Sequence, residues 1–175
     1  MGAWGSHADL SAGQGAESEI DLYIGRNWKL NPEWELRTTL THYSYPEDKR
    51  FFDYAYDEVV ASLGFRSRVF ATVALSPNFT AHWHGVGVDN ETAVSYEMAA
   101  VQPLIGPVAA SAGVGYYDLP AGLNASYWFW NAGLACAVGH TQLTVSYIDT
   151  DQNAAAAFGY AATGSRWAGS VAWRF

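Results

Sequence analysis

The chain has 175 residues, with 17 Asp and Glu against 9 Lys and Arg, and a formal net charge of −8. This balance argues against nucleic acid as a partner, because neutralising phosphates requires clustered Lys and Arg. Half of the residues are hydrophobic and the mean hydropathy is −0.06, yet no segment approaches the run of about 20 apolar residues that a membrane helix needs. The length suits a single domain, which we place over residues 1–175.

In chain order, the sequence predicts ten β-strands, because apolar and polar residues alternate with period two along most of it. Signals for helices are poor, and Gly, Thr, Val and aromatic residues recur throughout. The expected strands cover residues 3–8, 18–30, 34–45, 53–66, 69–76, 93–105, 108–118, 126–138, 141–149 and 165–175. The chain is therefore expected to be all-β.

The expected strands each have one apolar and one polar face. Over residues 18–30, Ile20, Leu22 and Ile24 share one face, and Asp21 and Tyr23 share the other. The polar faces are rich in Ser, Thr, Gly, Ala and Tyr, whereas the outside of a soluble sandwich should carry more Lys and Glu. This pattern is typical of a transmembrane barrel, in which the apolar face contacts lipid and the polar face lines a lumen.

Short and long connections alternate between these strands. The short connections contain Asn, Pro or Gly, which favour turns, and cover residues 31–33, 67–68, 106–107 and 139–140. The long connections cover residues 9–17, 46–52, 77–92, 119–125 and 150–164. Membrane barrels show this alternation because tight turns lie at one rim and long loops at the other. We therefore predict an antiparallel up-and-down transmembrane β-barrel of about ten strands.

The last strand strengthens this prediction. Trp167, Val171, Trp173 and Phe175 share one face, and Arg174 lies on the other. A strand that ends on an aromatic carboxy-terminal residue resembles the assembly signal of bacterial outer-membrane proteins. The expected partners are therefore the lipid bilayer, the outer-membrane assembly machinery acting through this strand, and small solutes.

Aromatic residues gather near the ends of the expected strands, as in the interfacial girdles of membrane barrels. The expected girdle residues are Trp28, Trp34, Tyr127, Trp128, Trp130, Trp167, Trp173 and Phe175. An ordinary aromatic core explains any single Trp equally well. The grouping at strand ends favours the girdle.

Charged residues fall mainly on the polar faces. The expected lumen residues, which would select solutes by charge, are Asp21, Glu35, Arg37, Glu58, Arg66, Glu97 and Arg174. In a narrow pore, opposed charges screen ions by sign. The alternative is that these charges pair with each other and plug the interior.

Several segments resemble the TorF-like family of proteobacterial outer-membrane porins. The resembling segments are Gly2–Ser6, Glu19–Gly25, Tyr43–Pro46, Ser76–Phe79, Gly113–Tyr116 and Tyr147–Asp151. The resemblance implies passage of small solutes across a membrane, and it assigns no functional residues. Members usually begin with a signal peptide and further strands, which we do not find ahead of Gly2. The resemblance therefore leaves open a full-length parent of twelve strands.

Other residue groups offer weaker chemistry. His82 and His84 have the spacing of metal ligands on a strand, but a solvated loop is the expected alternative. Asp149 and Asp151 lack the rest of a calcium loop, and the lone Cys136 is expected to pack rather than react. No Gly-x-Ser-x-Gly motif occurs, and His42 has no evident nucleophile partner in the sequence. We expect no enzyme, metal or cofactor.

The sequence thus predicts a porin-like channel in the outer membrane of a Gram-negative bacterium, which passes small charged solutes by passive diffusion. Two alternatives remain open. A non-conducting barrel would act in adhesion or envelope structure through its long loops. A soluble lipocalin-like binder would need its apolar faces inside.

Overall fold

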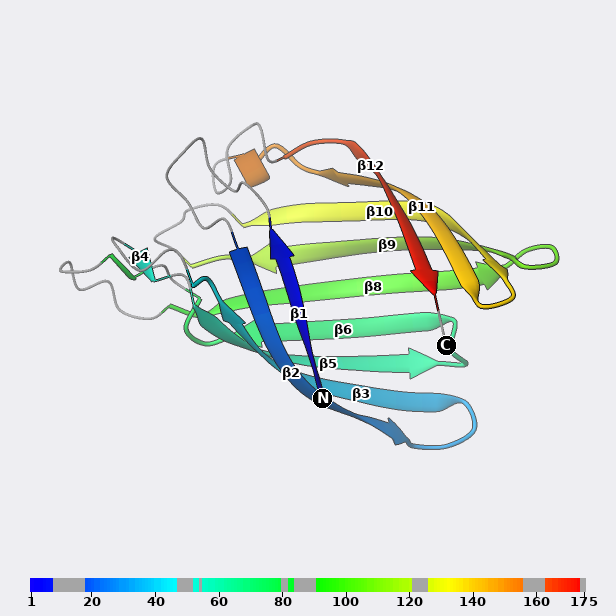
Figure 1. Ribbon diagram of the computed structural model, residues 1–175, viewed down its shortest axis with the longest axis horizontal. Helices are drawn as coiled ribbons and strands as arrows, with labels where there is room; N and C mark the ends of the chain where they lie inside the picture. Colours follow the sequence, from blue (N-terminus) through cyan, green and yellow to red (C-terminus); the bar gives the residue numbers. More distant parts are fainter. Residues whose placement is uncertain are drawn as a thin grey trace.

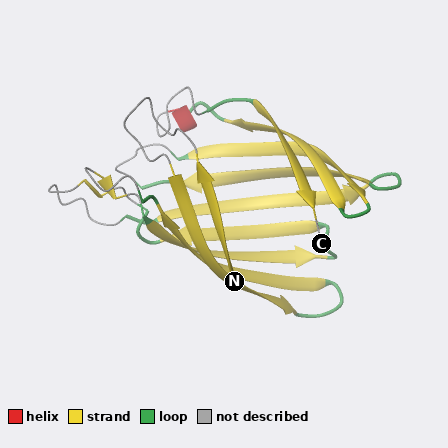
Figure 2. Ribbon diagram, viewed as in Figure 1, coloured by secondary structure: helices red, strands yellow, loops and turns green. Residues whose placement is uncertain are grey.

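The computed structural model describes residues 1–7, 18–46, 52–53, 55–79, 82–83, 91–120, 126–155 and 163–173. Ten strands form one antiparallel sheet, in which each strand pairs with its neighbours in chain order (Figures 1 and 2). They are β1 (Gly2–His7), β2 (Ser18–Lys29), β3 (Trp34–Ser44), β5 (Tyr56–Phe65), β6 (Val69–Ser76), β8 (Ala93–Pro103), β9 (Val108–Asp118), β10 (Tyr127–Val138), β11 (Thr141–Thr150) and β12 (Arg166–Trp173). The all-β, antiparallel prediction is confirmed.

The strand boundaries differ from the prediction in a few places. The expected strand 53–66 ends at Phe65, because Arg66 and Ser67 have positive φ angles of 51° and 52° and form a turn. Two-residue strands, β4 (Phe52–Asp53) and β7 (His82–Trp83), form a separate small ladder; β7 falls in an expected connection, and β4 spans the expected boundary between a connection and the strand 53–66. The last strand is described as far as Trp173, so Arg174 and Phe175 lie outside the described residues.

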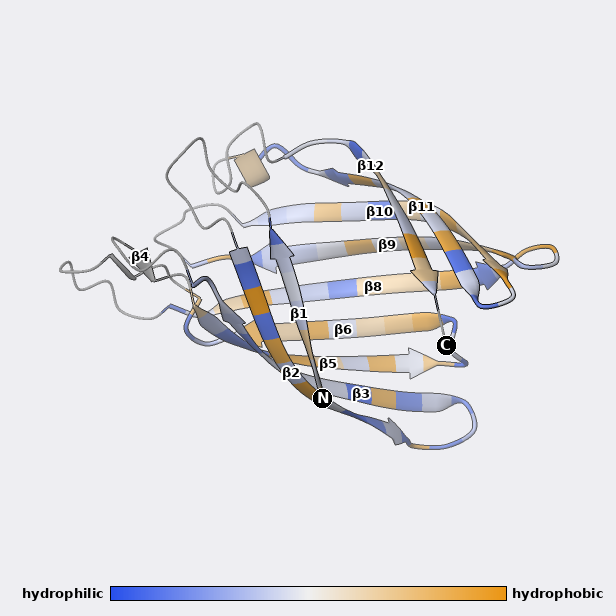
Figure 3. Cartoon of the chain, viewed as in Figure 1, coloured by the Kyte–Doolittle hydropathy of each residue, from blue (hydrophilic) through white to orange (hydrophobic). Residues whose placement is uncertain are grey.

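From β5 to β11, one face of the sheet is mostly less exposed than the other, whereas β12 and the second half of β2 are exposed on both faces. We call the less exposed side the inner face and the other the outer face. Large apolar side chains on the outer face are strongly exposed, among them Leu22 (57%), Val145 (53%) and Trp167 (74%). The bands of alternating hydropathy along the strands are visible in Figure 3.

Very little apolar material is buried inside. Among the described residues, the buried hydrophobic side chains are Ala74, Ala93, Leu119 and Ala154. Three of these four are alanines, so the described part of the sheet has no core of large buried side chains. No helix among the described residues is long and apolar enough to cross a membrane.

The sheet curls, so that β1 and β12, its two edges, lie in front of the central strands in the view of Figure 1. No ladder joins these two edges within the described part of the chain. The strands are also staggered. One row of paired residues crosses the sheet through Trp34, Phe65, Val69, Ala100, Ala112, Ala132, Tyr147 and Trp167.

This row starts at one rim of the sheet and approaches the other. Trp34 begins β3 directly after a short turn, whereas Trp167 is the second residue of β12 and follows a long connection. Successive strands are therefore displaced in one direction. Such a stagger is the geometry of strands that tilt across a curled sheet.

Candidate functional site

The inner face carries charged residues from five strands, and the pairing register sets their positions. Arg37 and Glu97 lie in one row, separated by Ser62 and Thr72. At about 4.8 Å per strand, the three steps place the backbone positions of the two residues about 14 Å apart along the sheet. Thr72 links the row by donating to Ser62 Oγ at 2.9 Å. The side chain of Arg37 is held on its other side, where its Nε donates to Asn27 Oδ1 at 3.1 Å.

Glycines on the inner face make room for these side chains. A Cβ on Gly113 would lie 3.2 Å from Glu97 Oε1, and one on Gly64 would lie 3.0 Å from Glu35 Cγ. A Cβ on Gly115 would lie only 2.2 Å from the ring of Phe129. The inner face is therefore packed over its glycines rather than through a central core.

Carboxylates gather where the inner face meets the long connections. Glu58 accepts hydrogen bonds from the Tyr43 hydroxyl and the Ser76 hydroxyl, each at 3.2 Å. Asp21 is paired directly with Tyr43 across the β2–β3 ladder. It is only 8% exposed, and its Oδ1 has no hydrogen-bond partner. Just beyond the end of β3, burial and the nearby Glu19 raise the pKa of the Tyr45 hydroxyl.

An aromatic chain runs beside these carboxylates. Tyr43 stacks on Tyr56 with ring centroids 4.4 Å apart, and Tyr56 meets Phe79 at 5.2 Å. Phe79 then contacts Tyr117 at 5.8 Å, and Tyr117 contacts Tyr127 at 5.8 Å. The chain links β3, β5, β9 and β10. The alternation of the strands signals the inward position of the tyrosines, but nothing in the sequence signals Phe79, which follows β6.

Of the expected lumen residues, Asp21, Glu35, Arg37, Glu58 and Glu97 lie on the inner face by their register. Arg66 differs, because it lies in the turn after β5 rather than on the strand. Its Nε donates to Glu33 Oε1 at 2.8 Å, and a second guanidinium nitrogen contacts the same oxygen. This exposed ion pair joins two neighbouring short turns.

The expected girdle residues separate into two groups on the outer face. Trp28, Trp34 and Trp173 lie near the short turns, where the Arg26 guanidinium lies 3.9 Å from the centroid of the Trp28 ring. Trp128, Trp130 and Trp167 lie toward the long connections. Contacts with Tyr116 and Tyr147 support this second group: Trp128 lies 5.1 Å from Tyr116, and Trp167 lies 5.4 Å from Tyr147, between ring centroids. Tyr127 belongs to the inner face instead.

The weaker candidates from the sequence remain weak. His84 lies outside the described residues, and only the backbone of His82 is described. No group of three metal-ligating side chains occurs in the described ranges. Asp151 accepts hydrogen bonds from the backbone amides of Asn153 (3.0 Å) and Trp128 (3.2 Å), so it holds local backbone structure.

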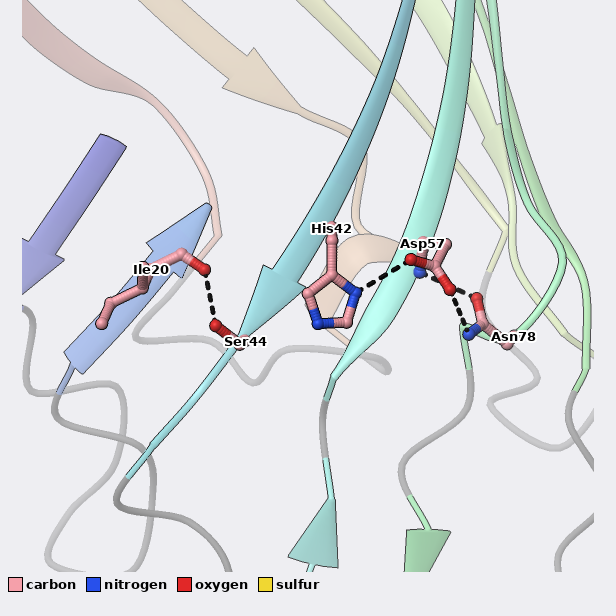
Figure 4. A network of polar contacts seen from close by, with 5 residues as sticks. All are labelled: Ile20, His42, Ser44, Asp57 and Asn78. Carbon is pink, nitrogen blue, oxygen red and sulfur yellow. Dashed lines mark hydrogen bonds and ion pairs between the residues drawn. The ribbon is translucent and has the colours of Figure 1, made fainter. Parts of the chain in front are cut away.

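A polar network that the sequence did not predict lies on the outer face (Figure 4). His42 Nδ1 is 2.9 Å from Asp57 Oδ1. Asn78 holds Asp57 twice: its Nδ2 donates to Asp57 Oδ2 at 3.1 Å, and its Oδ1 accepts the Asp57 backbone amide at 2.8 Å. The available signal was the spacing of His42 and Ser44, because alternate residues of a strand share a face.

Comparison with known proteins assigns the whole chain to one family. A family model described as a bacterial protein of unknown function, Gcw_chp, matches residues 1–175. The chain belongs to the Gcw_chp family. Neither the curated proteins nor the solved structures contain a match to this Gcw_chp protein.

Proposed function

We propose that this Gcw_chp protein is an outer-membrane β-barrel of a Gram-negative bacterium that passes small charged solutes by diffusion, as its resemblance to TorF-like porins implies. The observation that carries the proposal is the distribution of side chains. Large apolar residues cover the outer face, and the register places Asp21, Glu35, Arg37, Glu58 and Glu97 on the inner face. In the proposed barrel, lipid covers the outer face and water fills the inner side.

The free energy of burying apolar side chains supports a lipid environment for the outer face. Burying one large apolar side chain stabilises a protein by about 1.5–3 kcal/mol, and the outer face exposes such residues on every one of its long strands. Summed over that face, the unrealised burial exceeds the total stability of about 5–15 kcal/mol that typical proteins have. A soluble lipocalin-like binder would need the opposite arrangement of faces.

Three further features support closure and orientation of the barrel. The strands are staggered in one direction, as tilted barrel strands require. The two edge strands lie on the same side of the curled sheet. The outer Trp residues fall into two groups at opposite ends of the strands, which is how interfacial girdles are arranged. In this proposal β1 and β12 complete the barrel, and β12 is the strand that the assembly machinery recognises.

The inner face supports selection by charge. Asp21, Glu35, Glu58 and Glu97 outnumber the basic side chains that the register places inside on the same strands, Lys29 and Arg37. A lumen with excess carboxylates favours cations. We therefore propose that cations pass more readily than anions.

Two measurements test the proposal in sequence. The protein should refold only with detergent or lipid, and should then show a mobility shift between boiled and unboiled samples on a gel. Monodisperse protein in plain buffer would contradict the membrane placement. Refolded protein in planar bilayers should then give cation-selective channel events, and their absence would favour a non-conducting barrel that acts through its long connections.

Reversing a charge tests whether the inner face determines the ion selectivity. Arg37→Glu removes an inward cation and should increase the preference for cations in bilayer recordings. The matched control is Arg68→Glu, which makes the same charge change in an exposed turn. An equal shift in both variants would contradict the role of the inner face.

A further inference from the structure

The His42–Asp57–Asn78 network has the order of a hydrolytic relay. A carboxylate only accepts hydrogen bonds, so the proton of a neutral His42 lies on Nδ1, facing Asp57 at 2.9 Å. Nε2 is then free to accept a proton. Asn78 fixes Asp57 through two hydrogen bonds. Asp57 in turn contacts His42, so Asn78 helps to hold the orientation of the imidazole indirectly.

Ser44 supplies a hydroxyl on the other side of the same ring. It lies two residues after His42 on β3, so both side chains project from one face of the strand. In Figure 4, Ser44 and Asp57 lie on opposite sides of the His42 ring. The Ser44 hydroxyl donates to the Ile20 carbonyl at 2.8 Å. One rotation about its Cα–Cβ bond redirects it, and such loose contacts are common in catalytic sites without substrate.

The surroundings indicate what this relay would act on. His42 and Asp57 are about half exposed, with 50% and 49% of their side chains accessible. They line an outer-face groove together with Leu22, Ile24 and Leu40. An apolar groove beside the His42–Asp57 pair fits an acyl chain, and its ester carbonyl would have to extend past His42 to reach Ser44, two residues further along β3.

We propose that Ser44, His42 and Asp57 form a site that hydrolyses the acyl esters of membrane lipids. The inference shares the membrane placement of the proposed function but requires no open pore. The site lies on the outer face, at the strand ends that lead into the long connections. In the proposed barrel this is the level at which lipid ester groups meet water.

The reaction balances with water as the only co-reactant. Ser44 Oγ passes its proton to His42 Nε2 and attacks the ester carbonyl carbon. The bond to the lipid alcohol breaks, and the alcohol leaves with that proton. Nε2 then takes a proton from water, which attacks the acyl-serine, and Ser44 recovers a proton from Nε2 as the fatty acid departs. Asp57 stabilises the imidazolium in both halves.

The test uses the full chain, refolded in detergent, with phospholipid in mixed micelles as substrate. We expect release of fatty acid, with rates that fall by about 10³-fold or more in Ser44→Ala and His42→Ala. Asp57→Asn should also reduce the rate strongly, because it no longer fixes the tautomer of His42. His140→Ala is the matched control, since His140 lies in a short turn beside Trp173, and it should retain full activity.

A second measurement tests the site without relying on the phospholipid chosen as substrate. A fluorophosphonate with a long alkyl chain should label Ser44, which mass spectrometry of the digested protein would locate, and Ser44→Ala should abolish labelling. Heat-dependent gel mobility verifies folding, and bilayer conductance of Ser44→Ala should be unchanged. Folded protein that neither releases fatty acid nor takes the label would overturn the inference. So would hydrolysis that persists in Ser44→Ala. If the wild-type protein itself shows no gel shift or no conductance, that result would instead contradict the proposed function.

Discussion

The two faces of the sheet are stabilised in different ways. On the inner face, side chains contact other parts of the protein: Phe129 covers Gly115, and Glu58 accepts hydrogen bonds from Tyr43 and Ser76. On the outer face, the side chains of Val145 and its neighbours are exposed, so they contact mostly the medium around the protein. A substitution inside therefore tests packing and hydrogen bonds, whereas a substitution outside tests the solvent around the protein.

The largest expected contrast comes from one charge placed on either face. Val145→Arg puts a guanidinium near the middle of β11 on the outer face, and if that face meets the bilayer midplane, as we propose, the substitution should cost about 2–4 kcal/mol. Thr144→Arg, the matched control, puts the same group on the inner face and should cost less. Urea titrations of protein in lipid vesicles, followed by Trp fluorescence, measure both unfolding free energies. Equal costs would remove the distinction between the faces.

A smaller contrast tests packing over glycine. Gly115→Ala places a methyl group 2.2 Å from the Phe129 ring, so the ring must move, and we expect a loss of about 1–3 kcal/mol. In Gly169→Ala, on the outer face of β12, the nearest atom is 3.9 Å away, so little should change. Adding Phe129→Leu to Gly115→Ala should recover part of the loss. The same urea titration measures these variants, and no recovery would show that the clash is elsewhere.

The smallest effect is expected at the rim. Glu33→Ala breaks the exposed ion pair with Arg66, and such pairs contribute about 0–1 kcal/mol. The unfolding free energy should fall by no more than that, and less at high salt. A loss as large as that of Val145→Arg would mean that the short turns hold the sheet together.

The alternation of residues made most of the sheet predictable. Period-two patterns placed Leu22 outward and Asp21 inward, and a one-residue error would have exchanged the two faces. Turn residues located the short connections. The end of β5 was missed because Arg66 continues the alternation of polar and apolar residues in the sequence. Its positive φ angle cannot be predicted from an Arg side chain.

Contacts between distant segments were less predictable. Asp57 and Asn78 are 15 and 36 residues from His42 in sequence, and they meet because β3, β5 and the end of β6 are neighbours in the sheet. The sequence offered His42 without a partner, and the fold supplies one. Likewise, the tyrosines of the inner face form a continuous chain only because Phe79 lies between Tyr56 and Tyr117.

The central claim is that lipid covers the outer face and water covers the inner face. Nitroxide labels at successive positions of β11, in a Cys136→Ser background reconstituted in vesicles, test it directly. Labels at Leu143, Val145 and Tyr147 should be accessible to oxygen, which partitions into lipid. Labels at Gln142, Thr144 and Ser146 should be accessible to a water-soluble nickel chelate. Equal access to the chelate at both sets, or the opposite phase, would contradict the account.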